Sequence, residues 1–216
     1  MTYTGDVTPG GPAAVRELPD LTITKVSVGP MDNNAYLLRC TGTGEQLLID
    51  AANDADRLIE VIGGSGLSTV VTTHRHQDHW FALEDVIEAT RATSIAHPAD
   101  AVALPIVDST VEDGGTIRVG QCVLEVIHLV GHTPGSIALL YRDPSGFPHL
   151  FTGDSLFPGG PGRTTGGSDF DSLMADLQAK VFDKLPDETW FYPGHGRDST
   201  LGTERPSLPE WRARRW

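Results

Sequence analysis

The segment Thr73–His79, with the sequence THRHQDH, constrains the fold of this chain more than any other stretch. Three imidazoles and one carboxylate lie within its last six residues, directly after an apolar, β-branched run that predicts a buried strand. Side chains two residues apart in an extended chain point the same way, so His74 and His76 can reach one point. A turn then aims Asp78 and His79 at a neighbouring point. Because zinc takes neutral imidazole and carboxylate as ligands, the segment predicts a metal site at a strand end.

Three further residues lie at the ends of predicted strands, each in a glycine-containing turn: His132, Asp154 and His195. A single His or Asp in such a turn is more often structural. Neighbouring strands end at one edge of a sheet, so these side chains can converge with the histidine segment. Rigid strands then fix the metal geometry while the loops remain free to contact a substrate. The coincidence of all three with the histidine segment favours a shared metal centre.

The composition excludes several classes of protein. With 16 Lys and Arg against 29 Asp and Glu, the 216-residue chain carries a formal net charge of −13, which disfavours binding to nucleic acid. No apolar run approaches the roughly 20 residues of a membrane helix, and the N-terminus lacks the features of a signal peptide. Cys40 and Cys122 are too few for a disulfide scaffold and are predicted to be inert buried thiols. The sequence therefore predicts a cytoplasmic protein that binds neither nucleic acid nor membrane.

The length suits one domain with its own hydrophobic core. Residues 1–20 are polar and rich in Pro, Gly and Thr, and they are predicted to be a flexible N-terminal lead-in. Residues 21–216 are predicted to form a single domain. The 24 Gly and 15 Pro are spread along the whole chain, which favours many short elements joined by tight turns.

The apolar patterns predict strands separated by a few helices. The expected strands are Leu21–Val28, Ala35–Cys40, Gln46–Asp50, Leu67–Thr73, Thr93–His97, Thr116–Val119, Gln121–Val130, Ser136–Tyr141, His149–Thr152 and Thr189–Tyr192. The expected helices are Asp54–Ile62, Trp80–Thr90, Ser168–Lys184 with Ser168 as its cap, and Ser207–Arg215. This order suits helices packed outside two sheets. A Rossmann fold is disfavoured because no G-x-G-x-x-G follows the first strand.

The chain resembles the metallo-β-lactamase superfamily. The residues that carry this resemblance are His74-x-His76-x-Asp78-His79, then His132, Asp154 and His195, which correspond to the full ligand series of that superfamily. The match runs from about Leu21 to His195 and includes the stretches Asp32–Leu37 and Gly131–Ser136. It is most similar to the glyoxalase II (hydroxyacylglutathione hydrolase) branch.

The resemblance implies an α/β (α+β) fold, a four-layer αββα sandwich with a dinuclear metal site at one edge. It implies two divalent metal ions, with zinc as the first expectation and iron or manganese as alternatives. The ligands that it assigns are His74, His76 and His132 for the first metal, Asp78, His79 and His195 for the second, and Asp154 as the bridge. It makes no prediction of the oligomeric state.

These roles predict a hydrolase. A water shared by two metal ions becomes a hydroxide nucleophile near neutral pH, and the same ions polarise a substrate carbonyl. A thiolate leaves without a dedicated general acid, so the predicted substrate is a small acyl compound, a thioester or an ester. Asp78 is the expected catalytic residue because it can both bind metal and orient the hydroxide. Arg163 is a candidate clamp for a substrate carboxylate, with a structural ion pair as the alternative.

The match departs from glyoxalase II at several points. Only 21 residues follow His195, too few for the helical glutathione-binding domain, and the bulky Trp80-Phe81 replaces the usual small residues. The aspartate at position 154 argues against true β-lactamase activity. The alternative function is a mononuclear iron persulfide dioxygenase, whose facial triad would correspond to His74, His132 and Asp154.

The remaining histidines carry no predicted chemistry. His97, before a proline, and His128, on a strand, are expected to be structural, and His149 is expected to be exposed.

Overall fold

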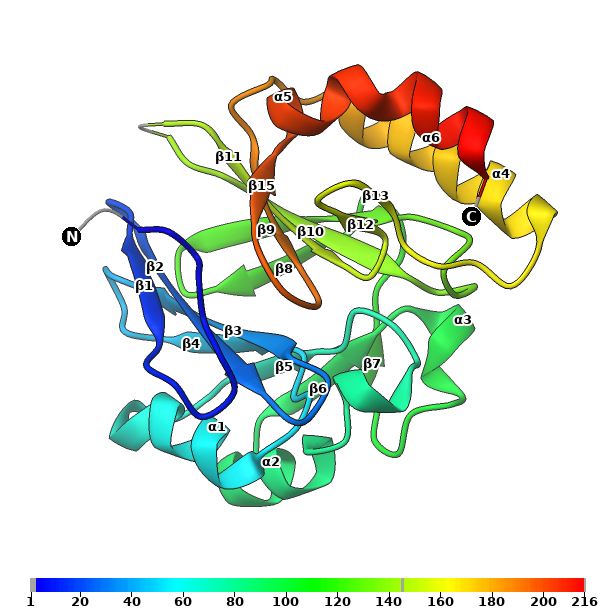
Figure 1. The fold of residues 1–216 in the computed structure, drawn as a ribbon. Coiled ribbons are helices and arrows are strands. Elements are labelled where there is room, and N and C mark those ends of the chain that lie inside the picture. Colours follow the sequence, from blue (N-terminus) through cyan, green and yellow to red (C-terminus); the bar gives the residue numbers. More distant parts are fainter. Residues whose placement is uncertain (1–2, 145, 216) are drawn as a thin grey trace.

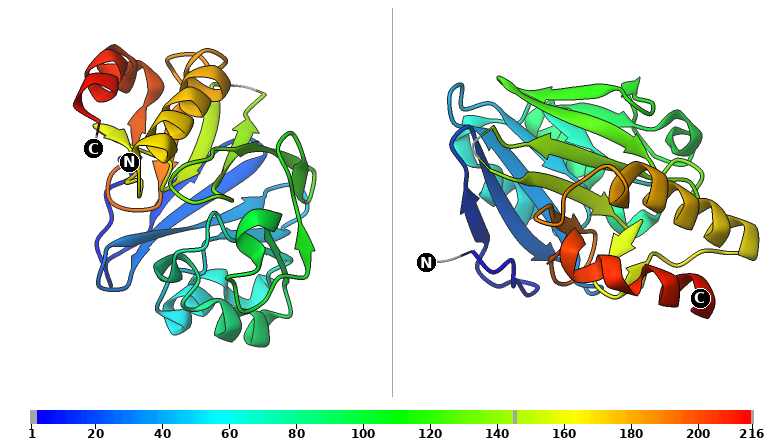
Figure 2. Two further views of the ribbon diagram at one scale, coloured as in Figure 1. Left: turned by 90° about the vertical axis from the view of Figure 1, so that its right-hand side faces the viewer. Right: turned by 90° about the horizontal axis from the view of Figure 1, so that it is seen from above.

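Two β-sheets pack face to face, and helices cover the outer face of each (Figure 1). The structure is a computed structural model that describes residues 3–144 and 146–215. Figure 2 shows the same arrangement from two further directions, with one group of helices beneath the first sheet and another above the second. This is the predicted four-layer αββα sandwich, an α/β (α+β) fold, and the prediction is confirmed.

The first sheet contains seven strands in the order of the chain. They are β1 (Ala14–Glu17), β2 (Leu21–Val28), β3 (Asn33–Cys40), β4 (Gln46–Ile49), β5 (Thr69–Val71), β6 (Thr93–Ala96) and β7 (Ser109–Thr110). The pairs from β1 to β4 are antiparallel, and those from β4 to β7 are parallel. The helices of this half are α1 (Ala55–Ile62), α2 (Leu83–Thr90) and α3 (Pro98–Ala101), with short 3-10 turns at Gly63–Ser65 and Gln77–His79.

The second sheet has the order β15-β14-β11-β10-β9-β8. Its strands are β8 (Thr116–Val119), β9 (Cys122–His128), β10 (Ile137–Arg142), β11 (Pro148–Gly153), β14 (Trp190–Pro193) and β15 (Ser199–Thr200). A small hairpin, β12 (Leu156–Phe157) and β13 (Gly160–Pro161), follows β11. The helices of this half are α4 (Gly167–Asp176), continued by a π-helical segment (Leu177–Phe182), α5 (Leu201–Glu204), a 3-10 turn (Arg205–Ser207) and α6 (Leu208–Arg214).

Three apolar clusters hold these layers together. The central cluster lies between the sheets and includes Leu38, Leu139 and Phe151, each with no exposed surface. A second cluster joins the second sheet to α4 and α6, and a third joins the first sheet to α1 and α2. Burial of apolar surface on both faces of each sheet is the main force that fixes the sandwich. None of the helices in the described part of the chain is long and apolar enough to cross a membrane.

The expected flexible lead-in over residues 1–20 is wrong for the part that the structure describes. Ala14–Glu17 forms the edge strand β1, paired antiparallel with β2. Tyr3 donates a hydrogen bond to Asp198, and the Arg16 guanidinium lies 4.1 Å from the centre of the Trp190 ring. This segment looks like a loop in the sequence because it buries few apolar side chains. Contacts with residues far along the chain hold it instead.

Most expected elements are present with bounds shifted by one to three residues. The predicted helix cap at Ser168 is wrong, because α4 begins at Gly167 after Gly166 and has no side-chain cap. The sequence did not predict β1, β7, β12, β13, β15, α3 or α5, all of which have two to four residues. Such elements are too short to show a hydrophobic period.

His149 was expected to be exposed, and this expectation is wrong. It lies on β11, faces the space between the sheets and is 1% exposed. Its Nδ1 lies 2.9 Å from the Tyr192 hydroxyl, and its Nε2 has no hydrogen-bond partner among the described residues. Burial, reinforced by the charge of Arg16, lowers the pKa of His149 to about 4.

Acid should therefore destabilise this fold through His149. The folded-state pKa of about 4 lies below the usual value near 6.5, so below pH 6.5 the unfolded chain binds more protons. The free energy of unfolding should fall by about 1.4 kcal/mol per pH unit from pH 6.5 toward 4 on this account. In urea unfolding at pH 7, 6 and 5, His149→Gln should show a shallower loss than the wild type. Equal slopes for the two proteins would contradict this assignment.

Candidate metal centre

The structure brings all seven predicted ligand residues to one edge of the sandwich. In the first group, the donor atoms are Nε2 of His74, Nδ1 of His76 and Nε2 of His132. The His132 nitrogen lies 2.9 Å from that of His76 and 3.3 Å from that of His74. Three donors from two loops, one in each half of the chain, thus point at one position.

A second group lies beside the first. Nε2 of His79 lies 3.4 Å from the Asp78 carboxylate and 3.2 Å from Nε2 of His195. His195 is in turn 3.3 Å from Asp78. These three donor atoms lie within 4.8 Å of one another, as do those of the first group.

Asp154 lies between the two groups. Its Oδ1 is 3.4 Å from Nε2 of His79, and its Oδ2 is 3.6 Å from His132 and 3.5 Å from His195. Oδ1 is buried and has no hydrogen-bond partner among the described residues. A buried carboxylate oxygen without a donor is costly unless a cation satisfies it. This arrangement suits a metal bound on either side of Asp154.

Strand ends and glycines produce this convergence. The turn with His74 and His79 follows β5, and Asp154 follows β11, which lies beside β14 and its His195 loop. A Cβ on Gly194 would lie 2.1 Å from Oδ1 of Asp154 and 2.6 Å from a ring carbon of His79. Only glycine lets the backbone of that loop approach the centre so closely.

Four of the five histidines are oriented by a contact on the ring nitrogen that faces away from the centre. Nδ1 lies 2.9 Å from Oδ2 of Asp50 for His79, 2.7 Å from the Arg163 carbonyl for His132, and 2.9 Å from the Met31 carbonyl for His195. In His74 it lies 3.1 Å from Oγ1 of Thr73. A carbonyl or carboxylate only accepts, so Nδ1 holds the proton. The lone pair of Nε2 is then free for a metal.

Two polar residues of this site were missed from the sequence. Asp50, at the end of β4, accepts from the Thr73 backbone and hydroxyl as well as from His79. Asn33, at the start of β3, donates from Nδ2 to Asp78 at 2.9 Å. Asp50 had a usable signal, since it ends an apolar strand as Asp154 does. Asn33 lies in the stretch Asp32–Leu37, whose one signal in the sequence is its likeness to the family.

Buried contacts outside the centre join the loops that hold it. Asp100 accepts from the Arg75 backbone and from Thr133 and Gly135, so it ties the histidine turn to the His132 loop. Trp80 donates from its indole to the Arg75 carbonyl at 2.8 Å. The bulky residue at position 80 therefore has a structural role in this turn.

A buried ion pair supports the His195 loop from the other side. The Lys25 ammonium and the Asp198 carboxylate lie 2.6 Å apart, and neither side chain is exposed. Lys25 also donates to the carbonyl of Gly196 at 2.7 Å and to that of Gly5 at 2.9 Å. All three donors of the ammonium are thus used, and the residue after His195 is fixed by a charged hydrogen bond.

Arg163 lies beside the first group but does not act on it through its charge. Its backbone carbonyl orients His132, while its exposed side chain lines a pocket of about 390 Å³ together with His76, Thr164 and Thr165. The predicted clamp residue therefore lies at the wall of a pocket next to the first group.

The charges of the site differ between its two halves. Burial and the nearby His79 charge lower the pKa of His74, and burial lowers that of His132. Burial also acts to lower the pKa of His79, but the carboxylates of Asp154, Asp50 and Asp78 outweigh it and raise that pKa. At His195, burial is likewise outweighed by the carboxylates of Asp154 and Asp78, which raise its pKa to about 10. A bound dication would displace these protons and would itself neutralise the negative charge of the carboxylates.

The donor set fits a divalent metal. Two ligands about 2.1 Å from a tetrahedral zinc ion lie about 3.4 Å apart, close to the separations within both groups. Imidazole and carboxylate also suit iron and manganese.

Comparison with known proteins agrees with this geometry. Residues 28–195 match the family model of the metallo-beta-lactamase superfamily. The chain belongs to the metallo-beta-lactamase superfamily. Members of this superfamily bind divalent metals and are mostly metal-dependent hydrolases.

Individual relatives within the superfamily differ in length and in name. The chain is 39% identical over 165 residues to a hydroxyacylglutathione hydrolase of Polaromonas sp. (strain JS666), covering 76% of this chain and 62% of that protein. The chain therefore spans less than two thirds of that curated relative.

Two solved structures share the fold at higher coverage. ETHE1 from Myxococcus xanthus has a TM-score of 0.78 and 30% identity, covering 88% of this chain and 84% of that one. The protein TTHA1623 in a di-iron-bound form has a TM-score of 0.72 and 32% identity, covering 86% and 98%.

Asp50→Asn should weaken metal binding while the fold is retained. The amide would place an N–H opposite Nδ1–H of His79, so that ring loses the acceptor that sets its tautomer. Loss of such a contact typically lowers metal affinity 10- to 100-fold. Competition with a chromophoric chelator measures this, with exposed Asp56→Asn on α1 as the control. The same affinity in both variants would refute the role of Asp50.

Proposed function

We propose that this chain is a metal-dependent hydrolase that cleaves a small thioester or ester at a dinuclear centre. The observation that supports it most is the presence of two complete donor groups, with Asp154 between them. Two divalent ions held there would lower the pKa of a shared water to about 7 and polarise a substrate carbonyl. We propose zinc for both ions, with iron and manganese as alternatives.

The ligands divide between the two groups. We assign His74, His76 and His132 to one ion, Asp78, His79 and His195 to the other, and Asp154 to both. The outward hydrogen bonds of His74, His79, His132 and His195 support this assignment, because each leaves Nε2 directed at the centre.

Asp78 is the proposed catalytic residue beyond its role as a ligand. One of its oxygens, Oδ2, receives a hydrogen bond from Asn33 and lies near His79 and His195. The other oxygen is then free to accept a hydrogen bond from the attacking hydroxide and to align it with the carbonyl carbon. Asn33 fixes the orientation of the carboxylate, so less conformational entropy is lost when the reactive geometry forms.

The proposed substrate is a small acyl compound, not a polymer. The pocket of about 390 Å³ beside His76 and His132 has room for a small molecule, and Arg163 at its wall offers a planar donor pair for a carboxylate. A thiolate leaving group departs with little protonation. The net charge of −13 also disfavours a nucleic-acid substrate. Similarity to a hydroxyacylglutathione hydrolase supports a thioester as the substrate. We also propose that the protein acts in the cytoplasm.

A mononuclear iron dioxygenase that acts on a persulfide is the second candidate. Two histidines of the first group, His74 and His132, form together with Asp154 the kind of triad that holds Fe(II) with open positions for O₂. This reaction would make no use of His195, which gives a clear distinction between the two candidates.

His195→Ala separates the two functions. For the hydrolase, bound zinc should fall from about two ions per chain to about one. Thioester cleavage should fall at least ~100-fold, because one ion would activate water and polarise the carbonyl less than two. Metal analysis and hydrolysis of S-lactoylglutathione and simple thioesters measure these values, with His128→Ala as the control. One iron per chain, retained in His195→Ala together with O₂ consumption, would favour the dioxygenase.

Chelation should abolish hydrolysis in the wild-type protein. The described residues of the two donor groups are carboxylates and imidazoles, so without metal they offer no hydroxide to attack the substrate. Activity should return when zinc or manganese is added back after removal of the chelator. Thioester hydrolysis that survives metal removal, verified by elemental analysis, would refute the metal mechanism.

A further inference from the structure

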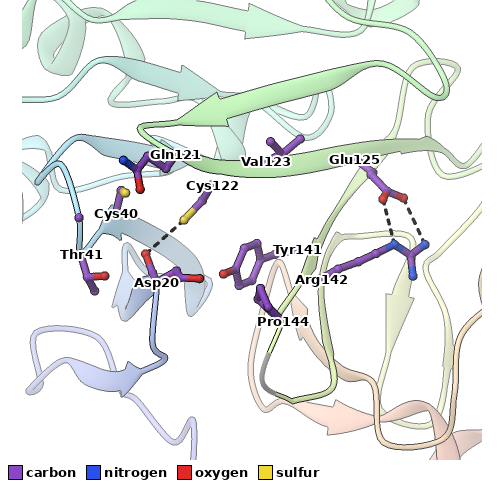
Figure 3. A pocket seen from close by; sticks show the side chains of 11 residues that line it. Asp20, Cys40, Thr41, Gln121, Cys122, Val123, Glu125, Tyr141, Arg142 and Pro144 are labelled. Atoms are coloured by element: carbon purple, nitrogen blue, oxygen red, sulfur yellow. Dashed lines mark hydrogen bonds and ion pairs between the residues drawn. The ribbon is translucent and has the colours of Figure 1, made fainter.

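A second pocket with reactive side chains lies far from the metal centre. Strand β3 begins at Asn33, which contacts Asp78, and ends at Cys40, about 24 Å away at ~3.4 Å per residue. At that far end is a pocket of about 430 Å³. Figure 3 shows the side chains that line it, including Cys40, Cys122 and Tyr141.

The two thiols come from opposite sheets and meet in this pocket. Cys40 ends β3 of the first sheet, and Cys122 begins β9 of the second. Sγ of Cys122 donates to the Asp20 carbonyl at 3.2 Å, and the same carbonyl accepts from the backbone N–H of Thr41, next to Cys40, at 3.0 Å. Cys40 and Cys122 also belong to the same buried apolar cluster between the sheets.

The turn between β8 and β9 packs directly on Cys40. Gly120 in this turn has φ +56°, and a Cβ added there would lie 2.8 Å from Cβ of Cys40, 2.9 Å from its Sγ and 2.1 Å from Oγ1 of Thr43. The backbone that carries Cys122 therefore lies against the Cys40 side chain. Cys122 follows Gly120 by two residues and lines the same pocket as Cys40, so this packing brings the two thiols near each other, as formation of a disulfide requires.

The two thiols differ in acidity. Burial acts to raise the pKa of Cys40, but hydrogen bonds from the Thr43 side chain and from the backbone of Gln121, Thr43 and Gly42 outweigh it and lower that pKa to about 6. Burial and the neighbouring Cys40 charge raise the pKa of Cys122 to about 11. The Cys40 sulfur is thus a nucleophilic thiolate at neutral pH, and Cys122 remains a protonated thiol.

We propose that Cys40 and Cys122 form a peroxide-sensitive thiol pair that closes to a disulfide between the two sheets. The Cys40 sulfur attacks one oxygen of hydrogen peroxide, the O–O bond breaks, and the departing hydroxide takes a proton to become water. The Cys122 sulfur then attacks the Cys40 sulfenic acid. The S–S bond forms as the S–O bond breaks, and the proton of Cys122 leaves with the hydroxide as a second water.

The pocket also selects the oxidant. Both cysteines are buried, so only a small reagent reaches the sulfurs through this space. Hydrogen peroxide fits this description, whereas a bulky organic hydroperoxide should react more slowly. The two thiols supply the two electrons that reduce one peroxide to two waters.

The test uses the zinc-loaded full chain and does not depend on its hydrolase activity. After treatment with hydrogen peroxide and a catalase quench, the protein is unfolded in N-ethylmaleimide and digested. The expected result is loss of the label from both cysteines and a peptide cross-link between them. In Cys122→Ser, dimedone should trap a sulfenic acid on Cys40, and in Cys40→Ser the label on Cys122 should persist.

A loop variant keeps the test valid if the cysteine variants fold poorly. Thr43→Ala removes an exposed hydroxyl that lowers the Cys40 pKa, so oxidation at pH 7 should slow by about three- to five-fold. Thr41→Ala is the matched control, because that hydroxyl donates to the Pro19 carbonyl instead. Full labelling of both wild-type cysteines after peroxide, or equal oxidation rates in Thr43→Ala and Thr41→Ala, would overturn the proposal.

Discussion

The hydrogen bonds of one buried carboxylate, Asp50, set the shape of the histidine turn. Its two oxygens accept from the backbone N–H of Thr73 at 2.7 Å, from the Thr73 hydroxyl at 2.8 Å and from Nδ1 of His79 at 2.9 Å. A carboxylate that is 1% exposed costs several kcal/mol unless donors surround it, so the turn must supply them. The Thr73 hydroxyl in turn lies beside Nδ1 of His74, and the chain of contacts reaches both halves of the centre.

The other loops of the centre are held by the same kind of interaction. Asp100 joins the Arg75 backbone to the His132 loop, and the ion pair of Lys25 and Asp198 fixes the loop that follows β14. Asp100 and Lys25 each make two of their hydrogen bonds to backbone groups, whereas Asp198 accepts from the side chains of Lys25, Tyr3 and Trp190. Loss of one partner would leave an unpaired buried charge, which is more damaging than loss of an exposed pair. The edge with the candidate metal centre is therefore held in place by residues that lie outside the two donor groups.

Local patterns predicted two sheets with helices outside them and the residues that converge at one edge. The four-layer sandwich was implied by the family resemblance. The alternation in Leu21–Val28 gave β2 with its observed bounds, and the spacing of His74 to His79 placed those side chains at one turn. The sequence could not show which polar groups are satisfied by distant partners. His149 looks exposed until Tyr192 and the second sheet are placed beside it.

The same limit applies to the lead-in and to the outer supports of the site. Strand β1 has four residues and alternates between half-buried and exposed positions, so its pairing with β2 is visible only in three dimensions. The sequence points to the guanidinium of Arg163, yet the group of this residue that contacts His132 is its backbone carbonyl. Every residue has a backbone carbonyl, so such a contact cannot be predicted from the types of side chain in the sequence.

The division of the ligands between two sheets has a consequence for how the protein is made. His74 and His195 are far apart in the sequence, and the second donor group needs residues from both halves. A growing chain can complete the first sheet and its histidine turn long before His195 leaves the ribosome. Contacts of such high sequence separation form late in folding. The second donor group is therefore completed only after both sheets have docked, so docking of the sheets is a precondition for any metal that this group would hold.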